Sequence, residues 1–155
     1  MGSVDAKDRF FAALPYLLPL IYVVPFGQYL FNQFPALQLI YLPIQPLLQL
    51  YSVFPFFGLI VFIVLLFLVV RNEDISHFIR FNTMQAILLD ILLILLRFAS
   101  RIFGQGLQGT FLLETLFNVV FLGMLAACIY AIAQSALGRY AEIPAISEAV
   151  HGQVR

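Results

Sequence analysis

An aspartate inside a long apolar stretch is the residue whose position most suggests chemistry. Asp90 interrupts Arg80–Leu96, RFNTMQAILLDILLILL, which reads as a membrane-spanning helix. An ionisable side chain inside such a helix is costly and usually faces protein or water rather than lipid. At about 100° per residue, Asn82, Asp90 and Arg97 fall within roughly 80° of one another. The stretch therefore predicts a helix with a polar edge, which begins in the cluster Arg80, Asn82, Thr83 and Gln85 and which the other segments must cover.

Two roles are open for Asp90. It could serve a proton or ion relay, or line a translocation path. Alternatively it pairs with Arg97, two turns along the same face and roughly 10 Å away along the helix axis. Glu114 is another acid near the same membrane edge. The ion pair is the interpretation we favour.

The last hydrophobic segment carries two further patterns. Glu114 and Asn118 share a face at a spacing of four, and we interpret them as interhelical hydrogen-bonding groups rather than a site. Small residues at the same spacing allow helix backbones to approach closely. That packing stripe consists of Gly123, Ala127, Ala131 and Ser135.

Nothing in the sequence predicts an enzyme, a metal site or a cofactor. His77 and His151 are isolated, and no Cys, His, Asp or Glu spacing resembles a metal site. Cys128 has no histidine near it in sequence, which argues against a nucleophile. No phosphate-binding loop is present, so any transport through this protein has to be driven elsewhere.

Composition places the chain among integral membrane proteins. Of its 155 residues, 63% are hydrophobic and only 10% are charged. Soluble domains are about half apolar and a quarter charged. Net charge is zero and no basic patch is present, so nucleic acid is not an expected partner.

Apolar segments predict an all-α bundle of four transmembrane helices in a single domain over residues 1–155. The spans are expected at residues 10–31, 53–71, 80–103 and 111–137. Pro15, Pro19 and Pro25 should bend the first into one kinked helix; a re-entrant pair is the alternative. Asp74 or Ser76 can cap the third span, Gly138 can close the fourth, and the tail after it is polar and short.

A segment over residues 35–51, between the first and second spans, is expected to be amphipathic and interfacial. It has no charged residue and is interrupted by Pro43 and Pro46. Its polar face consists of Gln38, Gln45, Gln49 and the adjacent Ser52. We interpret it as a connector lying on the membrane, with a broken span as the alternative.

Basic residues predict the orientation. With four spans, one side holds Lys7, Arg9, Arg71, Arg80, Arg139 and Arg155, and the other holds only Arg97 and Arg101. Because basic residues accumulate on the cytoplasmic side, both termini are expected there, or on the stromal side in a plastid.

Several stretches together resemble the Tic20 family over nearly the whole chain. The block FIRFNTMQAILLDILL at Phe78–Leu93 is the most specific, because it combines polar residues with a fixed apolar frame. The other matching stretches are ALPYLLPL, PFGQYLF, LQLIYLPIQPLLQLY and IPAISEAV. The resemblance implies four helices and a multi-spanning subunit of the translocon at the inner chloroplast envelope, or a cyanobacterial relative. It implies no catalytic residue.

Three functions follow as hypotheses. The first is a non-enzymatic protein-translocation subunit in a plastid inner envelope or cyanobacterial membrane. The rivals are a small ion or solute channel or transporter accessory with Asp90 on the path, and a scaffold for other membrane proteins. Because a bundle of this size fills its own core, translocation predicts an oligomer or larger complex. Expected partners are membrane lipid, other translocon or membrane subunits, and precursor polypeptides.

Overall fold

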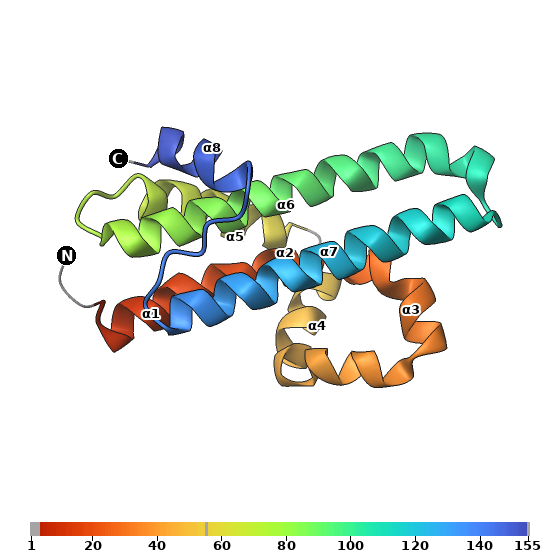
Figure 1. The fold of residues 1–155 in the computed structure, drawn as a ribbon, viewed down its shortest axis with the longest axis horizontal. Helices are drawn as coiled ribbons and strands as arrows, with labels where there is room; N and C mark the ends of the chain where they lie inside the picture. Colours follow the sequence, from red (N-terminus) through yellow and green to blue (C-terminus); the bar gives the residue numbers. More distant parts are fainter. Residues whose placement is uncertain (1–3, 55, 155) are drawn as a thin grey trace.

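The computed structural model describes residues 4–54 and 56–154, and every regular element in those residues is a helix. Helices α6 (His77–Phe103) and α7 (Phe111–Ala136) form a long hairpin that runs along the long axis of the molecule (Figure 1). In chain order, the other elements are α1 (Ala6–Ala13), η1 (Leu14–Tyr16), α2 (Leu17–Tyr22), η2 (Val24–Gly27), α3 (Gln28–Gln33), η3 (Pro35–Ile44), α4 (Gln45–Val53), α5 (Phe57–Val64), η4 (Leu65–Val70), η5 (Gly104–Leu107) and α8 (Ile146–Gln153). Of these, η3 and α4 project to one side of the hairpin, and most of the remainder lie along it (Figure 1).

Side-chain caps fix where the hairpin helices begin. The Ser76 hydroxyl accepts a hydrogen bond from the Ile79 amide at 3.4 Å, and Thr110 does the same for Leu113. At the far end of α7, Gly138 has a φ of 76°. The Arg139 amide bonds the Gln134 carbonyl at 2.8 Å and the Gly138 amide bonds Ser135, which together make a Schellman motif. The structure therefore confirms the predicted C-terminal cap at Gly138.

Prolines divide the first hydrophobic segment into short α and 3₁₀ pieces. Helices Ala6–Tyr22 and Val24–Gln33 follow one another with a bend of 53°. Proline removes an amide donor and clashes with the preceding turn, so short 3₁₀ pieces begin next to Pro15 and Pro25. A bend of this size fits either the kinked helix expected over residues 10–31 or the re-entrant pair, so the kinked span stays a prediction; the helical part begins earlier than expected, at Ala6.

The second hydrophobic region is more broken than the sequence suggests. Helix α5 begins at Phe57 rather than at residue 53, and the chain then continues as a π-helix, η4, to Val70. The expected interfacial segment is itself helical, as η3 and α4. The Tyr41 hydroxyl attaches it to the first segment by donating to the Leu20 carbonyl at 3.0 Å. Pro35–Val53 and Phe57–Val70 together make a second bent pair.

Length and composition identify fewer spans than the four expected. Within the described residues, Phe111–Ala136 alone is a single helix both long and apolar enough to cross a membrane. Counting each bent pair as one span raises the number to three. The all-helical class is confirmed, while the four-span count stays a prediction.

The C-terminal tail differs from the polar, short segment expected. It forms α8, whose Val150 is fully buried, and Val154 just beyond it is 3% exposed. Helix α8 packs against the first half of α6. The reason is its apolar spacing, since Ile143, Ile146, Val150 and Val154 recur at helical intervals.

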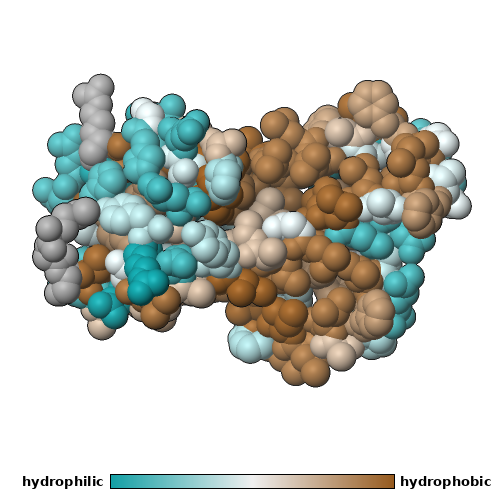
Figure 2. Space-filling model, in the orientation of Figure 1, coloured by the Kyte–Doolittle hydropathy of each residue, from teal (hydrophilic) through white to brown (hydrophobic). Residues whose placement is uncertain are grey.

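Polar and apolar surfaces are separated along the length of the molecule. The face drawn in Figure 2 is hydrophilic where α1, α8 and the loop before α6 meet, and mostly hydrophobic over the remainder, with further polar groups at its far edge. Both described ends of the chain lie at the first of these regions (Figure 1). This banding is what a bilayer requires of a protein that it surrounds.

Candidate functional site

The polar residues at the start of α6 form a buried hydrogen-bond network. Asn82 accepts at its Oδ1 from the Tyr16 hydroxyl at 2.7 Å and from the Ser135 hydroxyl at 3.2 Å. Its amide nitrogen donates to the Phe78 carbonyl at 2.8 Å. Asn82, Tyr16 and Ser135 are fully buried. One amide on α6 therefore ties together η1, α6 and α7.

Gln85, one turn further along, extends the network to the C-terminal segment. Its amide nitrogen donates to the Tyr16 hydroxyl at 2.8 Å and to the Ala141 carbonyl. Its Oε1 accepts from the Ile143 amide at 3.3 Å. Gln85 is also fully buried. Residues 141–143 lie between α7 and α8 and are not helical. Gln85 supplies partners for two of their backbone groups, which need hydrogen bonds when they are buried.

Arg80 is buried on the opposite side of the same helix. Its side chain is 7% exposed, and its Nε donates to the Val70 carbonyl at 2.9 Å. Val70 is the last residue of η4, where carbonyls lack partners within the helix. A cation at a helix C-terminus also opposes the partial negative charge there. Arg80 thus holds the end of η4 against α6.

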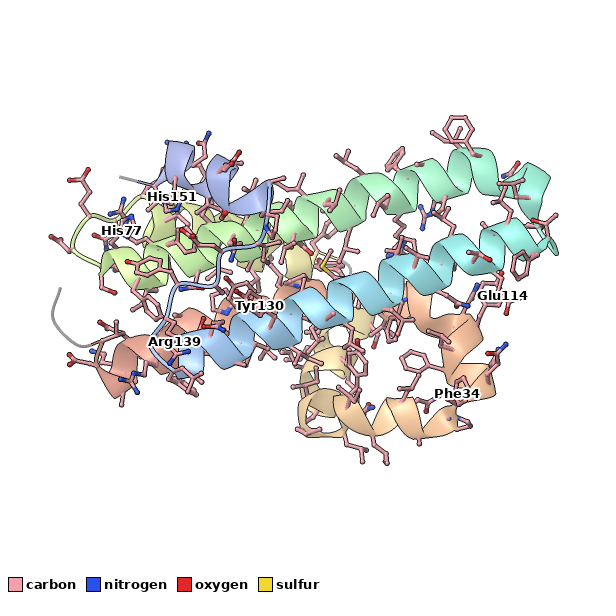
Figure 3. All side chains as sticks on the ribbon, viewed as in Figure 1. Phe34, His77, Glu114, Tyr130, Arg139 and His151 are labelled. Carbon is pink, nitrogen blue, oxygen red and sulfur yellow. The ribbon has the colours of Figure 1, made fainter. Side chains whose placement is uncertain are left out.

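Aromatic and ionisable groups hold α8 at the polar end of the molecule. His151 Nε2 lies 3.1 Å from Glu142 Oε1, within hydrogen-bond distance. His77 Nδ1 lies 2.9 Å from the Tyr140 hydroxyl. Partial burial, with the charges of Arg80 and His151, lowers the pKa of the His77 imidazole. His77 and His151 lie close together in Figure 3, far from Glu114.

Asp90 lies beyond the network, against the second hydrophobic region. Its side chain is 1% exposed, and its Oδ1 has no hydrogen-bond partner within the described residues. It borders a cavity of about 300 Å³ together with Tyr22, Gly58 and Phe62. A Cβ on Gly58 would overlap the Tyr22 hydroxyl, so glycine is what lets α5 approach Tyr22 here.

The expected ion pair between Asp90 and Arg97 is absent from the structure. Arg97 is exposed and borders a different cavity, with Tyr22 and Arg101. The two side chains share a helix edge, as the sequence indicates. Arg97 lies two turns closer to the end of α6 than Asp90, and its side chain is exposed there. Asp90 is buried. The polar edge is therefore buried at Asn82 and Asp90 and open at Arg97.

The polar pair on α7 is divided in its contacts. Gln33 of α3 donates to Glu114 Oε1 at 3.3 Å, which links two helices near the α6–α7 turn. Asn118 Oδ1 is buried and has no hydrogen-bond partner among the described groups. Figure 3 shows Glu114 close to α3.

The small-residue stripe on α7 is similarly divided along its length. Ala131 and Ser135 are fully buried, Ala127 is half-buried, and Gly123 is exposed. A Cβ on Gly123 would meet no atom within 4 Å. The buried half of the stripe faces the core, where Ser135 bonds Asn82, and the other half is more open.

These buried polar side chains hold helices together through neutral hydrogen bonds. In residues 4–54 and 56–154, no group of three His, Cys, Asp or Glu side chains could hold a metal ion. Cys128 is buried with its sulfur free. Sequence reasoning identified Asn82 and Gln85 but missed Tyr16 and the backbone at 141–143. A tyrosine hydroxyl within an apolar helix was the available signal, because a buried hydroxyl needs a partner.

Comparison with known proteins identifies the family. Residues 7–150 match the family described as chloroplast import apparatus, Tic20-like. The chain belongs to the Tic20 family. A Tic20 family protein of Synechocystis is 57% identical over 159 residues, which is 99% of this chain and 97% of that protein. TIC 20-v, a chloroplastic protein of Arabidopsis thaliana, is 37% identical over 98% of this chain and 73% of its own length.

A red-algal relative, the Tic20 family protein Ycf60 of Gracilaria tenuistipitata, is 36% identical over 99% of this chain and 78% of its own length. Relatives of the chain are thus found in a cyanobacterium and in photosynthetic eukaryotes, including proteins named as chloroplastic. The membership predicted from FIRFNTMQAILLDILL is confirmed, and the Tic20 residues quoted there include Asn82 and Gln85 of the buried network.

The network leads to a stability prediction for this Tic20 protein. Gln85→Leu should lower the melting temperature and expose residues after 138 to protease, because the Ala141 carbonyl and Ile143 amide lose their partner. Each orphaned buried group costs about 1–3 kcal/mol. Tyr16→Phe should cost less, because Asn82 keeps Ser135 and Gln85 keeps Ala141. Gln28→Leu, at an exposed position, is the control. Equal melting of Gln85→Leu and Gln28→Leu would contradict the network.

A second prediction concerns Asp90 and Arg97. Asp90→Leu should raise thermal stability by about 1–3 kcal/mol, since it removes a buried polar group that lacks a hydrogen bond. Arg97→Gln should change it little, because the guanidinium is exposed. Melting in detergent and the amount of folded protein in membranes are the measurements. If each single variant lowers both while the double variant recovers, the ion pair forms in the bilayer after all.

Proposed function

We propose that this protein is a non-enzymatic subunit of a protein-translocation complex in a plastid inner envelope or cyanobacterial membrane. In this role it contributes helices to the path of precursor proteins. Membership of the Tic20 family over residues 7–150 is the observation that carries the proposal. The structure is compatible with it, because its buried polar groups hold helices together.

Partners are part of the proposal. The core between α1–α2, α6 and α7 is filled by side chains such as Tyr16, Phe26 and Phe121. An extended polypeptide would therefore pass along the outside of this chain, in a space completed by other subunits. Large apolar side chains stand on that outside, including Leu95 and Phe98 on α6, which are 62% and 64% exposed. Lipid, a second copy or another subunit would cover them.

Four crossings are also proposed, with both termini on the cytoplasmic or stromal side. The two bent pairs and α7 supply three, and α6, at 27 residues, is long enough to supply the fourth. Its buried Asn82, Gln85 and Asp90 explain how a span this polar could exist, because protein covers these groups. The six-to-two division of basic residues supports the orientation.

Cysteine labelling tests the four-span arrangement. In a Cys128→Ser background, cysteines at Asp74 and Gln108 should react with a membrane-impermeant reagent from opposite sides. The two positions lie in the loop before α6 and in the turn before α7, at opposite ends of one helix. Both are exposed, so access is matched. Labelling of both from the same side would refute the arrangement.

Photo-crosslinking in native membranes tests the function. A photoreactive residue at Leu95 should crosslink to a precursor arrested during import, if the outer face of α6 borders the path. Leu68 on η4 has matched exposure, 63%, and is the comparison position on another face. Crosslinks to stable membrane proteins alone, from both positions, would support a scaffold and count against a precursor path.

A channel for ions or solutes is the second candidate, and Asp90 favours it. A buried carboxyl group beside a cavity and without a hydrogen bond at Oδ1 is a common feature of ion and proton pathways. Reconstituted vesicles separate the candidates. Flux that depends on Asp90 and is lost in Asp90→Asn, at unchanged protein level, would replace the translocation proposal. Absence of flux leaves translocation or a scaffold, which the crosslinks distinguish.

A further inference from the structure

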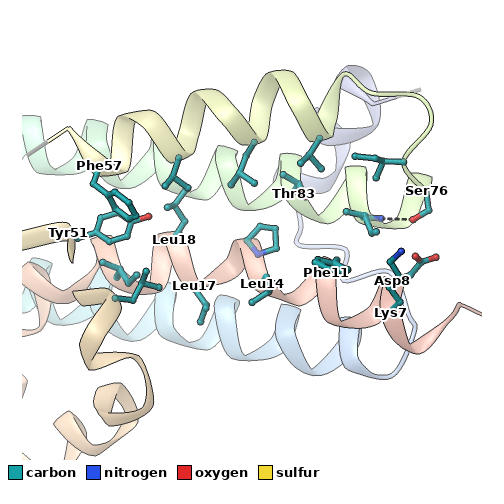
Figure 4. A pocket seen from close by; sticks show the side chains of 18 of the residues that line it. Lys7, Asp8, Phe11, Leu14, Leu17, Leu18, Tyr51, Phe57, Ser76 and Thr83 are labelled. Atoms are coloured by element: carbon teal, nitrogen blue, oxygen red, sulfur yellow. Dashed lines mark hydrogen bonds between the residues drawn. The ribbon is translucent and has the colours of Figure 1, made fainter. Parts of the chain in front are cut away.

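A groove lies between the first and second hydrophobic regions, and neither the buried network nor the proposed path uses it. Its volume is about 590 Å³ (Figure 4). One wall is α1–α2, with Phe11, Leu14 and Leu18, and the other is α5–η4, where Phe57, Val61, Leu65 and Val69 recur every four residues. Helix α6 packs against both walls and closes the floor.

Polarity changes along the groove in the way it changes with depth in a bilayer. Lys7, Asp8 and Ser76 stand at one end, and Tyr51 and Phe57 stand at the other (Figure 4). Asp74, two residues before Ser76 in the loop before α6, also lines the groove. Residues 7–21 of the first wall span about 22 Å at 1.5 Å per residue. One leaflet of hydrocarbon is about 15 Å thick. The groove is therefore long enough to pass from headgroup level to the middle of a membrane.

A hydroxyl without a partner lies on the floor of the groove. Thr83 is fully buried by the protein, lines the groove, and its Oγ1 has no hydrogen-bond partner among the described groups. Threonine in a helix commonly bonds the carbonyl four residues earlier, and Thr83 does not. A buried hydroxyl left unpaired costs free energy, which a ligand with a polar acceptor at this depth would recover.

We propose that this groove binds one acyl chain of a membrane glycerolipid whose headgroup carries no net negative charge, with the headgroup at Lys7, Asp8 and Asp74 and an ester carbonyl at Thr83. Thr83 follows Ser76 at the mouth by seven residues, or about 10 Å along α6. That is the region just below the headgroup, where the ester groups of a glycerolipid lie.

The size of the groove favours an alkyl chain over a helix. A helix about 10 Å wide and as long as residues 7–21 would occupy about 1,700 Å³. The groove offers less free space than that. An extended hydrocarbon chain is much thinner and can follow the alternating side chains of the two walls.

Selectivity should come from the mouth. An acyl chain gains little by moving from bilayer to groove, because lipid tails are as apolar as leucine. The polar contacts then decide which lipid stays. Two acids stand there with one lysine, so a zwitterionic headgroup can place its phosphate at Lys7 and its ammonium at Asp8 or Asp74, whereas a net anionic one meets an excess of negative charge.

Photolabelling of the purified full-length protein in nanodiscs tests this proposal independently of any translocation activity. The probe is a phosphatidylethanolamine with a photoreactive group in its acyl chain, and labelled peptides are located by mass spectrometry. Label should concentrate on residues 11–18 and 57–69. Unlabelled phosphatidylethanolamine should compete at least threefold better than phosphatidylglycerol.

Variants identify the groove itself. Val61→Trp should fill it and reduce the label at least fivefold, whereas Ile60→Trp, on the same helix but exposed, should leave the label unchanged. Leu14→Trp fills it from the other wall if Val61→Trp melts early. Thr83→Val, which keeps the shape and removes the hydroxyl, should weaken labelling about three- to tenfold.

Three outcomes would overturn the proposal. Label spread evenly over all outward faces means surrounding lipid only. Unchanged label in both tryptophan variants means that the groove is not the site. Labelling of the groove by a photoreactive precursor segment, but not by the lipid probe, means that a polypeptide occupies it.

Discussion

Two side-chain amides hold this fold together, because both are fully buried and each must find its partners in the protein. Asn82 and Gln85 do so through Tyr16, Ser135 and the backbone at 141–143, and thereby join η1, α6, α7 and the C-terminal segment. In a bilayer, lipid tails are as apolar as leucine side chains, so the free energy of apolar helix packing differs little from one helix register to another. A network with fixed donor and acceptor positions favours one register. The groups are neutral, so burying them avoids the penalty of burying ions.

How much the sequence predicts depends on whether a feature is local. The hairpin helices were expected at residues 80–103 and 111–137 and occur at His77–Phe103 and Phe111–Ala136. Their caps are short-range chemistry that can be recognised in a single stretch. The network is not local, since Tyr16 and Gln85 are 69 residues apart. Periodicity could show that α6 has a polar edge, but it could not show which groups complete it. Helix α8 was overlooked because its apolar spacing is spread over a polar tail, although Val150 and Val154 become buried.

The sequence prediction was less accurate for the charged residues Asp90 and Arg97 than for the neutral polar residues Asn82 and Gln85. Asp90 and Arg97 share an edge of α6, but the carboxyl is buried beside a cavity that Tyr22 and α5 also line, while the guanidinium is exposed. Burial differs along one helix edge because the neighbouring segments cover only the first part of α6. The broken second region has a similar origin. Residues 35–70 are apolar almost throughout, so the boundary between the expected segments over 35–51 and 53–71 was placed only to within a few residues of the end of α4 at Val53 and the start of α5 at Phe57.

The distribution of polar groups suggests how a small membrane protein can be rigid and still take part in a larger assembly. Its neutral amides are concentrated at one end of the hairpin, where α1, η1, α8 and the 141–143 backbone converge. The remainder of α6 and α7 carries apolar side chains outward, and Gly123 leaves open space on α7. A partner that binds there would pack against a surface already held in place from the other end, so it need not order the chain on binding. Preorganised surfaces lose less entropy when they associate. Substitutions in the two regions should therefore have different effects. Those in the network should act on folding, and those on the outer faces should act on assembly.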